Sequence, residues 1–314
     1  MIQNVFCATP FLLFSLFLSA LPMPAHALVL DTATSISKTY FSQELGFSGE
    51  LSEVTLWNAS YTFSRSRDAA ASFSDQTGAL LAGLDWDMSE PLGFHFDLAY
   101  SSTPAEGLRS GGFSLEAQYR LTLNGMKANA GEQEFEPFVQ FSPGLSWYRY
   151  SISSAVGETH VTGKRRTSTT SSSGGLLMGI SQRALDLRVK LGWVKWFATG
   201  FGVTRYTYDK SVAEFLSYLN SPLATVSGTG ALSSAVSGFS SRKAELFLNW
   251  FFVDDWDLAV NYYRFENAAD SSNSNSLKFI LGHDFSATWN AAIGIRRDVP
   301  EQQNTGYLYL THIL

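Results

Sequence analysis

Residues 242–265 constrain the fold more than any other stretch of the chain. Apolar side chains stand at every second position of its first half, namely Ala244, Leu246, Leu248, Trp250 and Phe252. After the polar turn at 253–255 the alternation resumes. Period-two alternation on both sides of a short turn predicts a β-hairpin. Each arm is long enough to cross a bilayer, which takes about 9–11 tilted residues. Trp250, Phe252 and Trp256 lie near the turn, as in an interfacial aromatic girdle. The sequence therefore predicts a membrane-spanning hairpin.

The composition agrees with a transmembrane barrel. Of the 314 residues, 45% are hydrophobic but only 16% are charged, against roughly 25% charged residues in soluble domains. Mean hydropathy is near zero, because lipid-facing and lumen-facing residues of a barrel strand alternate and average out. The net charge of −6 argues against a nucleic-acid partner, which requires a basic face. Composition alone is also compatible with a soluble β-sandwich or β-barrel.

The N-terminal segment is expected to be removed during export. Residues 11–18 form a short apolar run, and Ala25-His26-Ala27 provides an A-x-A cleavage site. We therefore interpret residues 1–27 as a cleaved signal peptide. The only cysteine, Cys7, lies inside this segment, so the mature chain has no disulfide, thiol nucleophile or cysteine metal ligand. No cofactor and no metal site is expected.

Residues 52–314 are predicted to form an antiparallel up-and-down β-barrel, an all-β fold of about twelve strands, with ten to fourteen possible. The expected strands are 53–66, 78–88, 93–102, 111–123, 135–151, 173–182, 184–208, the two arms of the hairpin, 275–285, 287–297 and 304–314. Long polar connections alternate with mostly short ones. Residues 28–51 are compatible with an extra strand, a tail or a plug. The spacing of Val212, Phe215, Leu216 and Leu219 predicts a short helix, placed either in the pore mouth or on the outer rim.

These features together resemble bacterial outer-membrane β-barrel proteins, a porin-like class. The resemblance rests on the export signal, the alternating strands, the asymmetry of the connections and the terminal strand 307–314. It covers residues 52–314. The chain ends in Leu314 where that class usually has Phe or Trp. The resemblance implies a location in the outer membrane of a Gram-negative cell.

The polar face of the strands provides the candidate functional residues. The predicted pore-lining set is Asp85, Asp87, His95, Asp97, Glu116, Arg120, Asp186, Arg188, Lys190, Glu245, Asn249, Asp257, Lys278, Asp284 and Arg296. His95 and Asp97 share one face, so a catalytic histidine–carboxylate pair is geometrically possible. No motif provides a nucleophile. An ordinary pore-lining role is the simpler interpretation, and no catalytic residue is predicted.

Charge position leads to two further expectations. Acidic residues of the predicted inner face, with Glu136 added, outnumber the basic ones, so an open pore should weakly prefer cations. Basic residues gather near the outer strand ends: Arg65, Arg67, Arg149, Lys164, Arg165, Arg166, Arg205, Arg242, Lys243, Arg264, Arg296 and Arg297. Arginine suits phosphate, so this rim is a candidate contact for outer-membrane lipid, including lipopolysaccharide. Solvated strand ends explain it equally well.

The predicted function is a passive, porin-like channel for small polar solutes. A closed barrel with a structural or surface-interaction role is the main alternative, because a barrel of this size can be filled by side chains. A barrel-embedded hydrolase is a third possibility.

Overall fold

The computed structural model describes residues 28–38, 40–66, 76–89, 91–103, 108–123, 136–153, 158–163, 166–171, 176–194, 196–219, 239–253, 255–299 and 303–314. The expected signal peptide, residues 1–27, lies outside this part of the chain. No helix among the described residues is long and apolar enough to cross a membrane.

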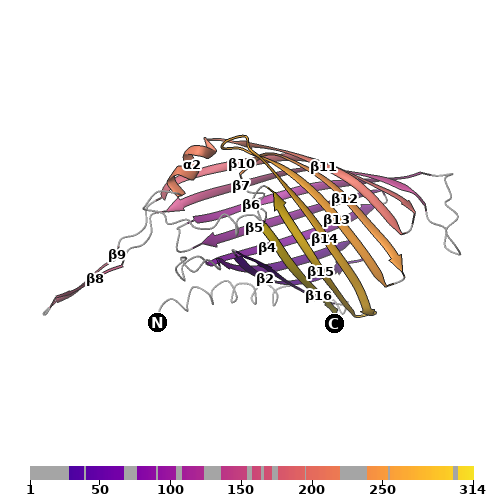
Figure 1. The fold of residues 1–314 in the computed structure, drawn as a ribbon, viewed down its shortest axis with the longest axis horizontal. Helices are drawn as coiled ribbons and strands as arrows, with labels where there is room; N and C mark the ends of the chain where they lie inside the picture. Colours follow the sequence, from indigo (N-terminus) through magenta and orange to yellow (C-terminus); the bar gives the residue numbers. More distant parts are fainter. Residues whose placement is uncertain are drawn as a thin grey trace.

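Fourteen antiparallel strands close into one barrel (Figure 1). They are β1 Val29–Ser37, β2 Tyr40–Ser52, β3 Thr55–Ser66, β4 Gln76–Ser89, β5 Leu92–Thr103, β6 Leu108–Thr122, β7 Phe138–Ser153, β10 Leu176–Val194, β11 Phe197–Tyr208, β12 Ser240–Val253, β13 Trp256–Asn267, β14 Asn273–Ser286, β15 Trp289–Val299 and β16 Gln303–Ile313. Each strand pairs with its sequence neighbour in the ring, so the topology is up-and-down. The predicted fold class is confirmed, with fourteen strands rather than about twelve.

The two additional strands come from the segment whose role the sequence left open. Residues 28–51 are neither a tail nor a plug, because β1 and β2 are part of the barrel wall. β1 pairs with β2 on one side and with β16 on the other, which closes the ring. The Thr311 hydroxyl donates to the Asp31 carboxylate across this closure, at 2.7 Å. The wall therefore begins at Val29 and not at residue 52.

The predicted boundaries are wrong between residues 173 and 208. The expected strands 173–182 and 184–208 imply a turn at Arg183, but β10 runs through this residue to Val194, and β11 is a separate strand. The polar run there is not a turn, because its residues pair in the ladders with β7 and β11, and Gln182 also has side-chain partners within the wall. The Gln182 amide donates to the Tyr208 hydroxyl at 2.7 Å, and its carbonyl oxygen accepts from Tyr150 at 3.3 Å.

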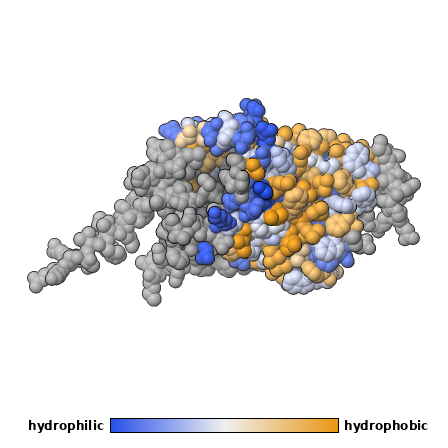
Figure 2. All heavy atoms as spheres, viewed as in Figure 1, coloured by the Kyte–Doolittle hydropathy of each residue, from blue (hydrophilic) through white to orange (hydrophobic). Residues whose placement is uncertain are grey.

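The alternation of polar and apolar residues along each strand gives the barrel wall an apolar outer face and a polar inner face. Exposed large apolar side chains face outward all around the ring, among them Leu84 on β4, Leu98 on β5, Leu185 on β10, Leu246 on β12 and Ile293 on β15. Figure 2 shows a broad apolar band on the visible face. Exposed aromatic side chains such as Trp86, Trp250 and Trp289 lie at one end of this band. Outer-membrane barrels have such a band with aromatic girdles.

The two ends of the barrel differ. At the end that we call the short-turn end, two residues join β2 to β3, β4 to β5, β10 to β11, β12 to β13 and β14 to β15; the connection from β6 to β7 is longer. The opposite, long-connection end carries the helix α2 Val212–Leu219 and a separate hairpin of β8 Glu158–Gly163 and β9 Arg166–Ser171 (Figure 1).

The helix α2 starts from a capping signal in the sequence. The backbone N–H of Glu214 donates to the Ser211 hydroxyl at 3.2 Å, as in a capping box. Val212 and Phe215 are fully buried against Leu108, Tyr150 and Ile180. On their strands, these three residues stand at the alternate positions whose side chains point into the barrel, which we call inward parity. The helix therefore folds into the mouth of the barrel, which was one of the two predicted positions.

Candidate functional site: the inner wall

All fifteen predicted pore-lining residues have the parity that points into the barrel. On each strand they alternate with the exposed apolar residues of the outer band. A solute path along them remains a proposal. The structure brings five of them together along one inner stretch of wall: His95, Asp97, Glu116, Asp186 and Arg188.

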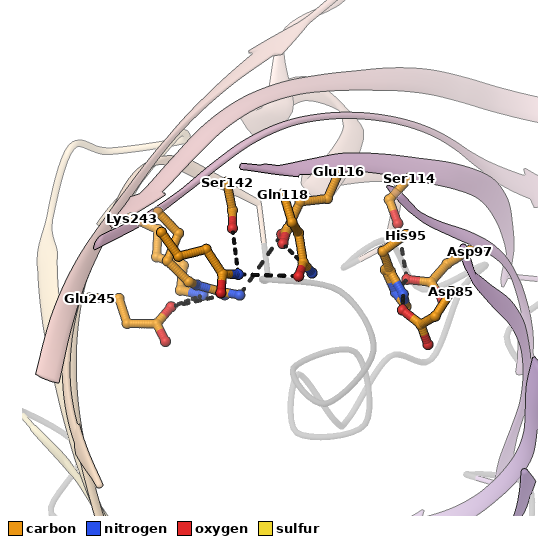
Figure 3. A network of polar contacts seen from close by, with 11 residues as sticks. Asp85, His95, Asp97, Ser114, Glu116, Gln118, Ser142, Lys243 and Glu245 are labelled. Atoms are coloured by element: carbon orange, nitrogen blue, oxygen red, sulfur yellow. Dashed lines mark hydrogen bonds and ion pairs between the residues drawn. The ribbon is translucent and has the colours of Figure 1, made fainter. Parts of the chain in front are cut away.

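His95 is held between two carboxylates. Its Nδ1 lies 2.5 Å from an oxygen of Asp85 on β4, and its Nε2 lies 2.8 Å from Asp97 on β5. The hydroxyl of Ser114, on β6, donates to the same Asp97 oxygen at 3.1 Å. Figure 3 shows this cluster projecting from the inner wall. Ionised carboxylates only accept hydrogen bonds, so with both of them ionised the ring donates from both nitrogens, which is the cationic imidazolium form.

This geometry does not fit a hydrolase. In a serine–histidine–acid triad, one ring nitrogen contacts the nucleophile and the other contacts the acid. Both nitrogens of His95 contact carboxylates, and Ser114 is hydrogen-bonded to Asp97 rather than to the ring. The ring has no nitrogen left to accept a proton from a nucleophile.

A second polar network continues around the wall. Gln118 donates to Glu116 at 3.1 Å, and the amide of Gln140 on β7 donates to Gln118 at 3.1 Å. Arg188 on β10 lies between two acids, 3.9 Å from Glu116 and 3.6 Å from Glu245 on β12. The network thus crosses from β6 to β12 through side chains alone (Figure 3).

Lys243 is a charged inner residue that the sequence interpretation missed. It was assigned to the outer basic rim, but its ammonium lies 3.0 Å from the carboxylate of Glu245 on the same inner face. The two residues are two positions apart, so strand parity alone would have placed them together. Glu136, counted with the inner acids, instead lies before the start of β7.

These two networks border an inner cavity of about 480 Å³. Neutral side chains complete its lining, notably Ser146, Tyr148, Gln182 and Tyr206. The sequence interpretation missed them because, apart from His95 and Asn249, it selected only acidic and basic residues. Hydrogen-bond donors, acceptors and both signs of charge therefore face the same space, an arrangement suited to small polar solutes rather than apolar ones.

Two glycines make room for acidic side chains on this wall. Gly83 lies opposite Asp97, and a Cβ at Gly83 would lie 2.5 Å from its carboxylate. Gly144 lies opposite Asp186, where a Cβ would lie 2.6 Å from the carboxylate. Glycine at these positions allows each acidic side chain to lie flat across the neighbouring strand.

The remaining basic residues of the predicted set lie outside this cavity. Arg120 packs over the Phe138 ring at 3.9 Å, with Lys190 at 5.9 Å from the same ring. Lys278 on β14 lies 4.7 Å from the Tyr307 ring, and Arg296 on β15 pairs with Asp298 at 3.1 Å. In the ring of fourteen strands, β14 is seven strands from β5, so Lys278 and the His95 cluster are on opposite walls.

Two acids of the predicted set lie near the short-turn end. Asp257 is opposite Gly282, and Asp284 accepts from the Asn290 amide at 2.6 Å.

His283 and His312 face outward instead and stack on Trp256 and Trp289, at 4.3 and 4.1 Å. Within the described ranges, no group of three or more His, Cys, Asp and Glu side chains is placed to hold a metal ion.

No family model matches the chain, and no curated protein matches its sequence. Solved structures of similar architecture include the following three. The Acinetobacter baumannii outer membrane protein Omp33 is 8% identical, with 92% of this chain and 98% of that chain covered and a TM-score of 0.48. The CymD monoaromatic hydrocarbon channel is 10% identical, with coverages of 92% and 88% and a TM-score of 0.47. The KdgM porin is 8% identical, with coverages of 90% and 98% and a TM-score of 0.42.

At such identities and TM-scores, the solutes of those proteins do not transfer to this chain. Its own strand topology and surface identify the architecture. A closed ring of fourteen antiparallel strands, apolar outside and polar inside, is the architecture of a transmembrane β-barrel of the outer-membrane type.

Proposed function

We propose that the protein is a passive outer-membrane channel for small polar solutes, with a weak preference for cations. The supporting observation is the inner cavity of about 480 Å³, whose lining combines carboxylates, basic groups, amides and hydroxyls. A wall built only to fill space would favour apolar, close-packed side chains. His95, Glu116 and Arg188 are held in polar networks on this wall, so the function that we propose is transport rather than catalysis.

Conductance tests the channel directly. Purified full-length protein in a planar lipid bilayer is expected to produce discrete single-channel current steps in KCl. A folded barrel that produces no current would instead be the closed structural barrel. One observation favours that rival: α2 buries Phe215 against the inner wall at the mouth, which narrows the opening.

The orientation proposed is that the long-connection end faces the cell exterior, because outer-membrane barrels have short periplasmic turns and longer outer loops. An epitope tag inserted at Gly228, between α2 and β12, should bind antibody on intact cells. Labelling that requires permeabilisation would mean the opposite orientation. At that end, Arg205, Arg242 and Arg264 of the basic rim would then contact outer-membrane lipid, including lipopolysaccharide.

A further inference from the structure

A groove on the outside of the barrel combines a basic end with an apolar floor. It has a volume of about 520 Å³ and lies over β10 to β13, towards the long-connection end. Arg205, Arg242 and Arg264 line it from three neighbouring strands, and Leu185, Leu187 and Val203 line it from β10 and β11. It is separate from the inner cavity, because these six residues have outward parity.

The arginines of the groove lie close together although their positive charges repel one another. Arg205 and Arg242 are direct partners in the β11–β12 ladder, and like charges directly opposite each other destabilise a sheet. One acid offsets them: Glu266 lies 3.9 Å from Arg242, whose side chain is 70% exposed. Arg264 donates to the Asn273 side chain at 3.5 Å. Within the described part of the chain, neither Arg205 nor Arg264 has an ion pair.

The apolar floor begins beside the arginines. Leu185 is the direct partner of Arg205, and Leu187 is the partner of Val203. Leu185 and Val203 are 69% and 50% exposed. They continue into the apolar outer band, which Figure 2 shows adjoining more hydrophilic side chains towards the long-connection end. The complementary ligand is amphipathic: an anion with oxygen acceptors for arginine, joined to apolar chains.

We propose that this groove binds a phosphate-bearing lipid of the leaflet at the long-connection end. Its phosphate lies among Arg205, Arg242 and Arg264, and its acyl chains run along Leu185, Leu187 and Val203. The proposal rests on the membrane location and orientation of the proposed channel, but not on an open pore.

Binding of diphosphoryl lipid A to the purified full chain in detergent micelles tests this site by native mass spectrometry. The R205Q/R242Q variant is expected to bind it roughly tenfold more weakly or worse, since it removes two charged hydrogen-bond donors from the phosphate. The matched control is R65Q/R297Q, which removes two exposed outward arginines elsewhere on the rim and should bind like the unaltered protein. A shift in gel mobility on heating shows that each variant is folded.

Three outcomes would overturn the proposal that this groove binds lipid. Equal loss in both double variants would mean a diffuse basic rim, and no loss in R205Q/R242Q would remove the arginines from binding. Displacement of lipid A by millimolar inorganic phosphate, with no weakening in L185S/V203S, would mean that the apolar floor contributes nothing. The KCl current of the unaltered protein in a bilayer without lipid A tests the channel separately, so either proposal can fail alone.

Discussion

At the scale of single residues, the inner wall shows how neighbours decide what a charged side chain does. His95 is the clearest example, because two carboxylates on adjacent strands hold both of its ring nitrogens. The sequence placed His95 and Asp97 on one face by parity. It did not reveal Asp85 as the second partner, because that contact depends on the β4–β5 register, in which Asp85 is opposite His95.

Replacing His95 with glutamine should increase the cation preference of the channel. The change removes a positive charge that lies between two carboxylates. A unit charge at 4 Å contributes about 1 kcal/mol in water, and salt reduces this, so the potassium-to-chloride permeability ratio should rise roughly twofold. Reversal potentials in a KCl gradient measure the ratio. His283→Gln on the outer face is the control and should leave it unchanged; an unchanged ratio in His95→Gln would contradict a cationic ring.

At the scale of elements, α2 should be the part that narrows the mouth. Phe215 is fully buried, and Phe→Ala substitutions at such positions cost about 3–5 kcal/mol. An eight-residue helix has little stability without such packing. Phe215→Ala should therefore release α2 from the inner wall and increase single-channel conductance. The exposed Ala213→Ser is the control. Equal conductance in the two variants would mean that α2 does not limit the current.

The N-terminal hairpin of β1 and β2 should be indispensable for folding of the barrel, whereas the β8–β9 hairpin should be dispensable. Deleting residues 29–52 would leave β3 and β16 as open edges, and unpaired backbone groups are not tolerated in a bilayer. Replacing residues 154–175 by a short Gly-Ser linker leaves the ring of fourteen strands intact. Heat-modifiable mobility on gels should be lost in the first variant and kept in the second. A heat-modifiable barrel without β1 and β2 would refute this role of the hairpin.

The same elements show what the sequence could and could not predict. The hairpin at 242–265 was predictable because its two faces differ sharply in polarity. β1 was not, since Thr32, Thr34 and Ser35 blur the contrast between its faces. Its membership in the wall depends on pairing with β16, more than 260 residues away. The continuous β10 was missed because the polar Ser181-Gln182-Arg183 resembles a turn, and the inner partners of Gln182 are set only by the closed ring.

At the scale of the whole molecule, the outer and inner faces of the barrel wall differ in chemistry. The outside carries an apolar band with arginines towards one end, which suits a bilayer with anionic head groups. The inside is charged with both signs, with an excess of acids that β1 and β2 increase. Asp31, Glu44 and Glu50 share the inward parity of those strands. The sequence estimate omitted them because it left residues 28–51 unassigned.

The added acids strengthen the expected cation preference, and Lys243 and cationic His95 partly offset it. The inward acids are Asp31, Glu44, Glu50, Asp85, Asp87, Asp97, Glu116, Asp186, Glu245, Asp257, Asp284 and Asp298, against Arg120, Arg188, Lys190, Lys243, Lys278, Arg296 and His95. A narrow, low-dielectric wall focuses the net negative field on passing ions. The preference should remain modest because salt screens charges over roughly 8–10 Å.

The sign of the reversal potential under a KCl gradient is therefore expected to indicate cation selectivity. Neutralising the N-terminal acids in D31N/E44Q/E50Q should move that potential towards zero, because it removes three negative charges from the inner wall. Asp270→Asn is the matched control: this acid lies in the exposed turn between β13 and β14, so its loss should leave the potential nearly unchanged. An anion-selective potential in the unaltered protein would mean that the solute path does not follow this acidic wall. Equal shifts in the triple variant and the control would assign the selectivity to the mouth instead.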